Sequence, residues 1–202
     1  MTATSAPAAG FADPVQQSQT AFRALLDAMA RPGRMTLIDS AVGHPDGVVP
    51  ALAAAALTLC DLDTPVWLGR GLDTEAMRGW LRFHTGAPLV SAPEKADFVL
   101  LDAAAGLPAL GMFHHGSDAA PEGGATLLVQ TGALDGAAAM TWHGPGIRDA
   151  STMPLCGLPE DFWHSRAALS AAFPRGIDLY LCAGSALIGL PRSTAISFTA
   201  EA

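Results

Sequence analysis

The sequence has few charged residues and a single lysine, and these shortages exclude several classes of protein. Only 15% of the 202 residues are charged while 50% are hydrophobic, which is typical of an ordered globular chain. The net charge is -8 and the arginines are scattered along the chain, which argues against a nucleic-acid partner, because phosphate backbones require clustered basic residues. The length fits one domain that buries a full core.

Long apolar runs are also missing. No stretch approaches the roughly 20 uncharged residues that span a bilayer, and the N-terminus lacks a basic region followed by an apolar one. We therefore expect a cytoplasmic protein that has no membrane partner. The small residues of positions 1–10, MTATSAPAAG, predict a disordered tail, and residues 11–202 are expected to form a single α/β domain.

The cysteines are few and far apart. Cys60, Cys156 and Cys182 each lie in an apolar sequence, so buried free thiols are expected. Their spacing does not suit zinc or an iron–sulfur cluster, so no metal site is expected in this chain.

The only lysine, Lys95, limits two further kinds of chemistry. It is followed by Ala96, whereas the phosphate-binding P-loop requires Ser or Thr at that position. Pyridoxal phosphate enzymes form a Schiff base with a lysine, but Lys95 follows Pro93 and Glu94 in a segment typical of an exposed loop. We therefore predict a surface lysine and no bound cofactor.

The first helix is expected to begin at Asp13-Pro14, because aspartate caps free amides and proline suits the first helical position. One apolar stripe should lie along this helix, formed by residues three or four apart: Phe22, Leu25, Leu26 and Met29. Further helices are expected at 48–59, 74–84 (capped by Asp73) and 160–173, with one or two helical turns at 107–113. Strands are expected at 35–38, 65–68, 98–101, 126–129, 138–142, 177–182, 187–190 and 195–198. This order predicts a mixed β-sheet with helices on both faces.

Two acidic or glycine-containing segments have a structural interpretation and a functional one. Gly69-Arg70-Gly71 follows an expected strand, as a dinucleotide fingerprint does, but the third glycine is missing, which favours an ordinary strand-to-helix connection. Asp61 and Asp63 could hold a magnesium-bound diphosphate, although aspartates before Thr64-Pro65 more often form turns.

The segment WHGPGIRDASTM, residues 142–153, is the strongest candidate for an anion contact. Amides around Gly144 and Gly146 could form an anion nest, and Arg148 could add a bidentate contact to a phosphate or phosphonate. Gly-Pro-Gly is equally what a sharp chain reversal requires, and the turn is the favoured interpretation.

An ordered set of short motifs resembles a family of small subunits from the bacterial carbon–phosphorus lyase core complex. The resemblance covers residues 11 to about 198 and rests on the order of these segments: Ala12–Pro14 with Phe22-Arg23, Met29–Gly33, Asp61–Trp67, Gly144–Ile147, Phe173–Asp178 and Leu190–Thr194. It implies a reduced form of the large domain of fold type I pyridoxal phosphate transferases, without the cofactor.

The resemblance also implies a role in phosphonate catabolism. In that family a multisubunit assembly forms ribose 1-methylphosphonate 5-triphosphate from MgATP and methylphosphonate and releases adenine. The apolar composition and the lack of a self-contained catalytic set favour a structural or interaction subunit that is homodimeric in isolation and docks on the other core subunits, in a noncatalytic or shared-site role, so no catalytic residue is assigned. The motif positions are candidates for interface or anion contacts (Gly144, Gly146, Arg148, Arg175, Asp178 and Arg192) or for turns and interfaces (Asp61 and Asp63).

Two other hypotheses compete with that of a complex subunit. One is a stand-alone anion-binding or phosphonate-binding domain, or a small enzyme, whose pocket gathers Arg148, Arg175 and Arg192. The other is an active pyridoxal enzyme, against which the single lysine argues.

Overall fold

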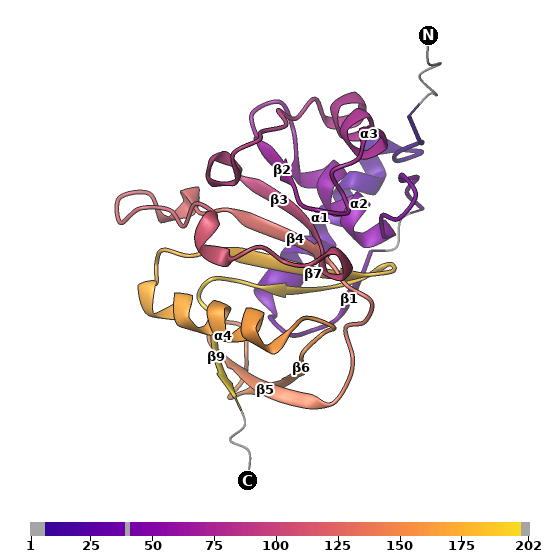
Figure 1. The fold of residues 1–202 in the computed structure, drawn as a ribbon. Coiled ribbons are helices and arrows are strands. Elements are labelled where there is room, and N and C mark those ends of the chain that lie inside the picture. The colour runs from indigo at the N-terminus through magenta and orange to yellow at the C-terminus, as the bar shows by residue number, and fades with distance from the viewer. Residues whose placement is uncertain (1–6, 39–40, 199–202) are drawn as a thin grey trace.

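A six-stranded mixed sheet forms the centre of the computed structural model, which describes residues 7–38 and 41–198 (Figure 1). Its strands lie in the order β1 (Thr36–Leu37), β8 (Ala186–Leu190), β7 (Asp178–Ala183), β4 (Thr126–Gln130), β3 (Phe98–Asp102) and β2 (Val66–Leu68). The four strands β2, β3, β4 and β7 are parallel, while β8 and β1 are antiparallel additions. The central strands are continuous apolar runs, as sheets covered on both faces require.

Three helices cover one face of this sheet: α1 (Pro14–Ala30), α2 (Pro50–Leu59) and α3 (Glu75–Thr85). The start of α1 is confirmed, with Asp13 accepting a hydrogen bond from the amide of Gln16. Helix α2 has no polar face, and Ala51–Ala56 are completely buried between α1 and the sheet. Alanine fits there because it allows close helix packing at no cost in side-chain entropy.

The other face is covered mainly by a second sheet and one helix. This sheet has the order β6 (Ser151–Pro154), β5 (Ala138–His143) and β9 (Ala195–Phe198), and helix α4 (Glu160–Leu169) packs with it. Figure 1 shows α4, β5, β6 and β9 gathered at one end of the molecule. The prediction of helices on both faces was therefore only partly right, and strand β6 was not predicted. Short 3-10 helices complete the fold at Pro93–Lys95 (η1), Ala103–Ala105 (η2), Leu110–Met112 (η3), Pro121–Gly123 (η4) and Ser170–Ala172 (η5).

The predicted apolar stripe of α1 does not face the core. Only Leu25 of its four members is buried, and the helix packs on the sheet through Ala21 and Ala28 instead. A Cβ added to Gly189 of β8 would lie 2.6 Å from the backbone of Ala28, so the two backbones are in close contact. Because only small residues fit at this distance, the larger apolar side chains are turned outward.

Two other expectations differ at the start of the chain and at α3. Thr74, not Asp73, caps α3 by accepting from the amide of Met77, since Asp73 pairs with Arg78. In the expected disordered tail, residues 1–6 lie outside the described part, but Ala9 accepts a hydrogen bond from the indole of Trp80 (3.1 Å). The described end of the tail is therefore attached to α3.

Candidate functional site

The Gly144–Arg148 segment is the turn between β5 and β6. The amide of Ile147 donates to the carbonyl of Gly144 (3.2 Å), and both glycines have positive φ, +146° at Gly144 and +84° at Gly146. A Cβ on Gly146 would lie 2.2 Å from the carbonyl oxygen of Ala30. The glycine is therefore required by a close approach to the end of α1 as well as by its backbone conformation.

Three of the motif segments meet around this turn. Gly146 lies against Ala30 and Pro32, and a Cβ on Gly144 would lie 3.0 Å from the carbonyl oxygen of Ser193. A Cβ on Gly33 would lie 3.0 Å from the sulfur of Met153 in β6. The end of α1, the β5–β6 turn and the segment after β8 thus form one packed junction.

Asp178 and Arg192 form a hydrogen-bonded ion pair beside this junction. The Asp178 carboxylate accepts from the Arg192 amide (2.7 Å), from its Nε (3.0 Å) and from its Nη2 (2.5 Å). Arg192 also donates to the carbonyls of Pro121 and Gly124. The side chains are 23% and 14% exposed, so the pair ties β7, the end of β8 and η4 together from a largely buried position.

A buried arginine that sequence reasoning missed lies next to this pair. Arg166 of α4 is 1% exposed, and its Nη2 donates to the carbonyl of Pro191 (2.8 Å). Burial lowers the pKa of the Arg166 guanidinium to about 10, while Asp178 acts to raise it and Arg192 to lower it further. Its position three and four residues after Trp163 and Phe162, on the apolar side of α4, was the signal for this burial.

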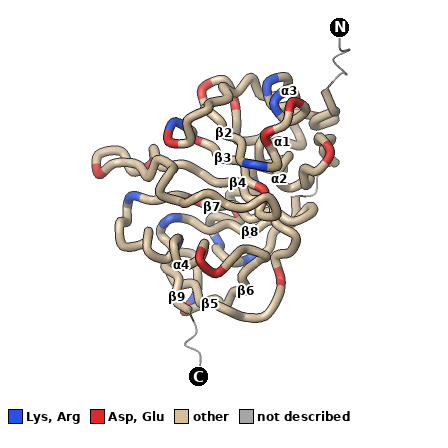
Figure 2. The backbone as a smooth tube through the Cα atoms, in the orientation of Figure 1, with Lys and Arg blue, Asp and Glu red and all other residues tan. Residues whose placement is uncertain are grey.

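The structure does not gather the three arginines of the hypothetical anion pocket around a common space. Arg192 is bound to Asp178, and Arg175 pairs with Asp118 across 3.0 Å. Arg148 is exposed on the β5–β6 turn and makes no hydrogen bond or ion pair within the described residues. Figure 2 likewise has the Lys and Arg positions spread along the described chain.

Asp61 and Asp63 lie in the turn between α2 and β2. Asp61 accepts from the amide of Asp63 (3.0 Å) and its own amide donates to the hydroxyl of Thr64 (2.7 Å), which is an aspartate-type turn. The turn lies at the amino end of β2, away from the carboxyl ends where parallel sheets hold ligands. Over residues 7–38 and 41–198, no group of three or more His, Cys, Asp or Glu side chains could hold a metal ion.

The carboxyl edge of the parallel strands is partly filled by the chain itself. Gln130, at the end of β4, is buried, and its side-chain amide accepts from the backbone of Val49 (3.2 Å) and donates to that of Gly47 (2.9 Å). The backbone amide of Ala51 donates to Gly184 after β7 (2.9 Å). The segment before α2 thus occupies the place above β4 and β7 where open α/β sheets usually bind ligands.

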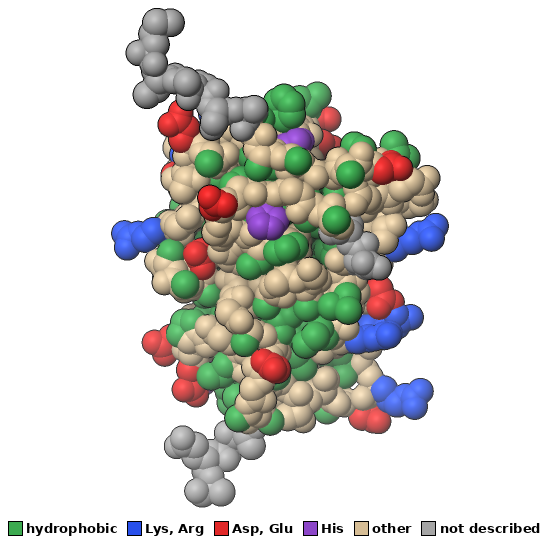
Figure 3. Space-filling view, turned by 90° about the vertical axis from the view of Figure 1, so that its right-hand side faces the viewer, with side chains coloured by type: hydrophobic (Ala, Val, Ile, Leu, Met, Phe, Trp, Pro, Cys, Tyr) green, Lys and Arg blue, Asp and Glu red, His purple; other side chains and the backbone are tan. Residues whose placement is uncertain are grey.

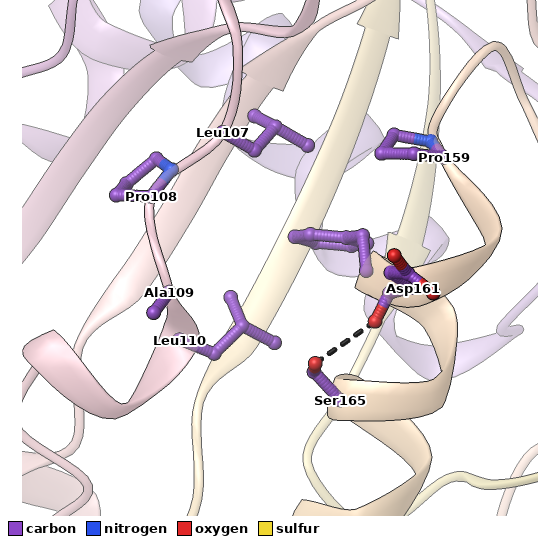
Figure 4. Close-up of a pocket in the computed structure, with 8 residues that line it drawn as sticks. Leu107, Pro108, Ala109, Leu110, Pro159, Asp161 and Ser165 are labelled. Atoms are coloured by element: carbon purple, nitrogen blue, oxygen red, sulfur yellow. Dashed lines mark hydrogen bonds between the residues drawn. The ribbon is translucent and has the colours of Figure 1, made fainter.

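Two hollows of the described part of the chain are notable, and neither brings several charged groups together. One, of about 180 Å³, lies between the 107–110 segment and the first turns of α4, where the Ser165 hydroxyl donates to the Asp161 backbone carbonyl (2.8 Å; Figure 4). The other, of about 320 Å³, lies at the amino ends of β3, β4 and β7, and Asp178 is its charged lining residue.

Together these features define a mixed α/β domain in which the partly buried Asp178 and Arg192 pair with each other and the buried Arg166 donates to a backbone carbonyl. Its free cysteines are buried, and Lys95 is exposed in η1 at the amino end of β3. No helix within the described ranges has the length and apolar character needed to cross a membrane.

Comparison with known proteins identifies the family. The model of the family described as bacterial phosphonate metabolism protein (PhnH) matches residues 9–197, so the chain belongs to this family. It is 40% identical over 184 residues to alpha-D-ribose 1-methylphosphonate 5-triphosphate synthase subunit PhnH of Rhizobium meliloti (strain 1021), covering 91% of this chain and 92% of that protein. It is 31% identical over 188 residues to the putative C-P lyase subunit protein HtxG of Stutzerimonas stutzeri, covering 90% and 86%.

Proposed function

We propose that this chain is a subunit of a carbon–phosphorus lyase core complex that acts in phosphonate catabolism. The observation that carries the proposal is the 40% identity to a synthase subunit across nine-tenths of both chains, which leaves no large part of either fold unmatched. The reaction supported is the formation of ribose 1-methylphosphonate 5-triphosphate from MgATP and methylphosphonate, with release of adenine.

The role we propose within the complex is noncatalytic or that of one partner in a shared site. The charged groups that could act on a substrate are bound within the chain, as Asp178 is to Arg192 and Arg175 to Asp118. Among the candidate arginines Arg148, Arg175 and Arg192, Arg148 is the exception, because it is exposed and lies on a turn that packs closely against the end of α1. Any contact with a substrate anion is therefore expected from Arg148 at the edge of a neighbouring subunit's site.

We further propose that the chain forms a homodimer when the other subunits are absent and that it is located in the cytoplasm. We also propose that its fold is related to the large domain of fold type I pyridoxal phosphate transferases but that it binds no pyridoxal phosphate. The exposed position of Lys95 supports the absence of the cofactor, since a Schiff-base lysine must be held beside its cofactor in a site.

Adenine release from MgATP and methylphosphonate tests the proposal directly. The reaction is run with this chain alone, with the remaining core subunits alone and with the complete mixture. We expect activity that requires the complete mixture. Equal activity of the remaining subunits without this chain would refute the proposal, and turnover by this chain alone would refute the noncatalytic role.

Arg148→Ala in the complete mixture separates the two possible roles. A drop in adenine release with normal assembly is the result expected of a shared site, whereas unchanged release would leave this chain a structural subunit. Calorimetric titration of methylphosphonate into the chain alone tests the stand-alone binding domain, which requires heat that Arg148→Ala abolishes.

A further inference from the structure

Helix α1 presents most of its large apolar residues to solvent, and the residues that it buries are Ala21, Leu25 and Ala28. Val15 is 75% exposed, Phe22 46% and Leu26 53%, and they lie seven and four residues apart, on one side of the helix. The partly buried Met29 continues the row at the end of the helix. We call these four residues the α1 stripe. An exposed apolar row of this length, displaced from the core by the close contact at Gly189, is typical of a surface covered by another chain.

The α1 stripe leads into the larger of the two hollows. Met29 lines this space of about 320 Å³ together with Leu59 from the end of α2, Phe98, Tyr180 and Pro191, and the polar residues Thr126 and Asp178 complete the lining. The volume is sufficient for one large apolar side chain. A helix of a partner protein can dock on such a surface by lying along the exposed apolar row and inserting one large anchor side chain into the hollow.

Basic side chains border the α1 stripe, although the whole chain carries a net charge of -8. Arg23 is exposed one residue from Phe22 and has no ion pair within the described residues. Arg31 and Arg34 follow the end of the helix and share the single carboxylate of Asp27. Figure 3 shows one face of the molecule, with hydrophobic side chains in its middle and both Lys/Arg and Asp/Glu side chains mostly at its edges.

These charges select between possible occupants. A second copy bound through a two-fold axis would bring the two Arg23 side chains toward each other, because each lies beside the middle of its stripe. Like charges at an interface oppose association, whereas acidic side chains in the partner would complement all three arginines. The surface therefore fits a different chain better than another copy of this one.

We propose that the α1 stripe and its hollow bind an apolar helix of another carbon–phosphorus lyase core subunit, one flanked by acidic side chains. This inference rests on the proposed function, which requires partner subunits. The anchor of that helix occupies the hollow beside Met29, and its acidic residues contact Arg23, Arg31 and Arg34.

Co-purification with the remaining core subunits of the same source, one of them carrying the affinity tag, tests the proposal. Phe22→Glu should lower the fraction of this chain retained by about tenfold or more, as for a central interface residue. Phe83→Glu is the matched control, since Phe83 of α3 is 69% exposed and lies outside the α1 stripe. Arg23→Glu should lower retention several-fold and weaken its dependence on salt. Thermal unfolding of each isolated variant verifies that the substitution leaves the fold intact.

The outcomes distinguish this inference from the proposed function. If wild type is not retained, the proposed function itself fails. If wild type is retained and Phe22→Glu is retained equally, or if Phe83→Glu is lost to the same extent, only the α1 stripe is refuted as the docking site. If Phe22→Glu abolishes self-association of the isolated chain but leaves retention unchanged, the occupant is a second copy and the inference is overturned.

Discussion

Gly146→Ala should destabilise the protein by more than an unfavourable backbone angle alone explains. Placing alanine at φ +84° costs about 1–2 kcal/mol, because its Cβ crowds the following carbonyl in left-handed conformations. The new Cβ would also lie 2.2 Å from the carbonyl oxygen of Ala30, a backbone atom that moves only if the end of α1 moves with it. Together the two effects predict a loss of roughly 3–4 kcal/mol in the free energy of unfolding.

Gly47→Ala is the matched control for this prediction. Gly47 has a similar φ of +80°, but an added Cβ would have no atom within 4 Å among the described residues. Gly47→Ala should therefore lower the free energy of unfolding only by the cost of the unfavourable backbone angle, about 1–2 kcal/mol. Chemical and thermal unfolding of both variants measures the difference, at about 2–4 °C per kcal/mol for a domain of this size. Equal losses in the two variants would refute the view that the β5–β6 turn is packed tightly on α1.

Three further predictions concern the buried groups and the exposed arginine. Arg166→Ala should lower the free energy of unfolding by about 3 kcal/mol, because it leaves a cavity and an unpaired carbonyl. Arg166→Met should lower it less, because methionine retains most of the packing. Urea unfolding of both variants measures the difference. Burial raises the pKa of Cys60 and Cys182 to about 12, so these thiols hold their protons more tightly in the folded protein than in the unfolded chain. The free energy of unfolding should therefore fall as the pH rises above about 8.5, where the thiols of the unfolded chain ionise. Ellman's reagent should react with these thiols only after unfolding. Reaction of both thiols in the native protein at pH 8 would contradict this. Arg148→Ala should change the unfolding free energy by less than about 0.5 kcal/mol, because Arg148 is exposed, and a larger loss would mean that the arginine has a structural partner.

Local signals in the sequence were sufficient where one residue type controls the outcome. Asp13 and Pro14 were sufficient to predict the start of α1, and the alanine-rich segment 48–59 was sufficient to predict helix α2. The strands expected at 177–182 and 187–190 are also confirmed, and they pair as the antiparallel β7–β8 hairpin. These features depend on neighbours within a few residues, so periodicity and turn chemistry reveal them.

Pairings between distant segments were not predictable in the same way. β5 follows β4 in the sequence but belongs to the other sheet, where it lies between β6 and β9. Arg166 lies in a helix whose polar and apolar residues are poorly separated around the helix axis, and the carbonyl that it contacts, that of Pro191, is 25 residues away in the sequence. Such contacts depend on how the elements pack, which no local pattern encodes.

By itself, the sequence determined that this chain is an ordered, acidic α/β protein with buried thiols and one exposed lysine, and its ordered motifs pointed to the phosphonate family. Only the tertiary structure decided which residues of α1 face the core. The periodicity of α1 placed an apolar stripe on the helix, but the close contact between Ala28 and Gly189 admits only small side chains. Helix α1 is therefore oriented with Phe22 and Leu26 facing outward, because the close contact between the backbones of α1 and β8 outweighs the tendency of large apolar residues to be buried.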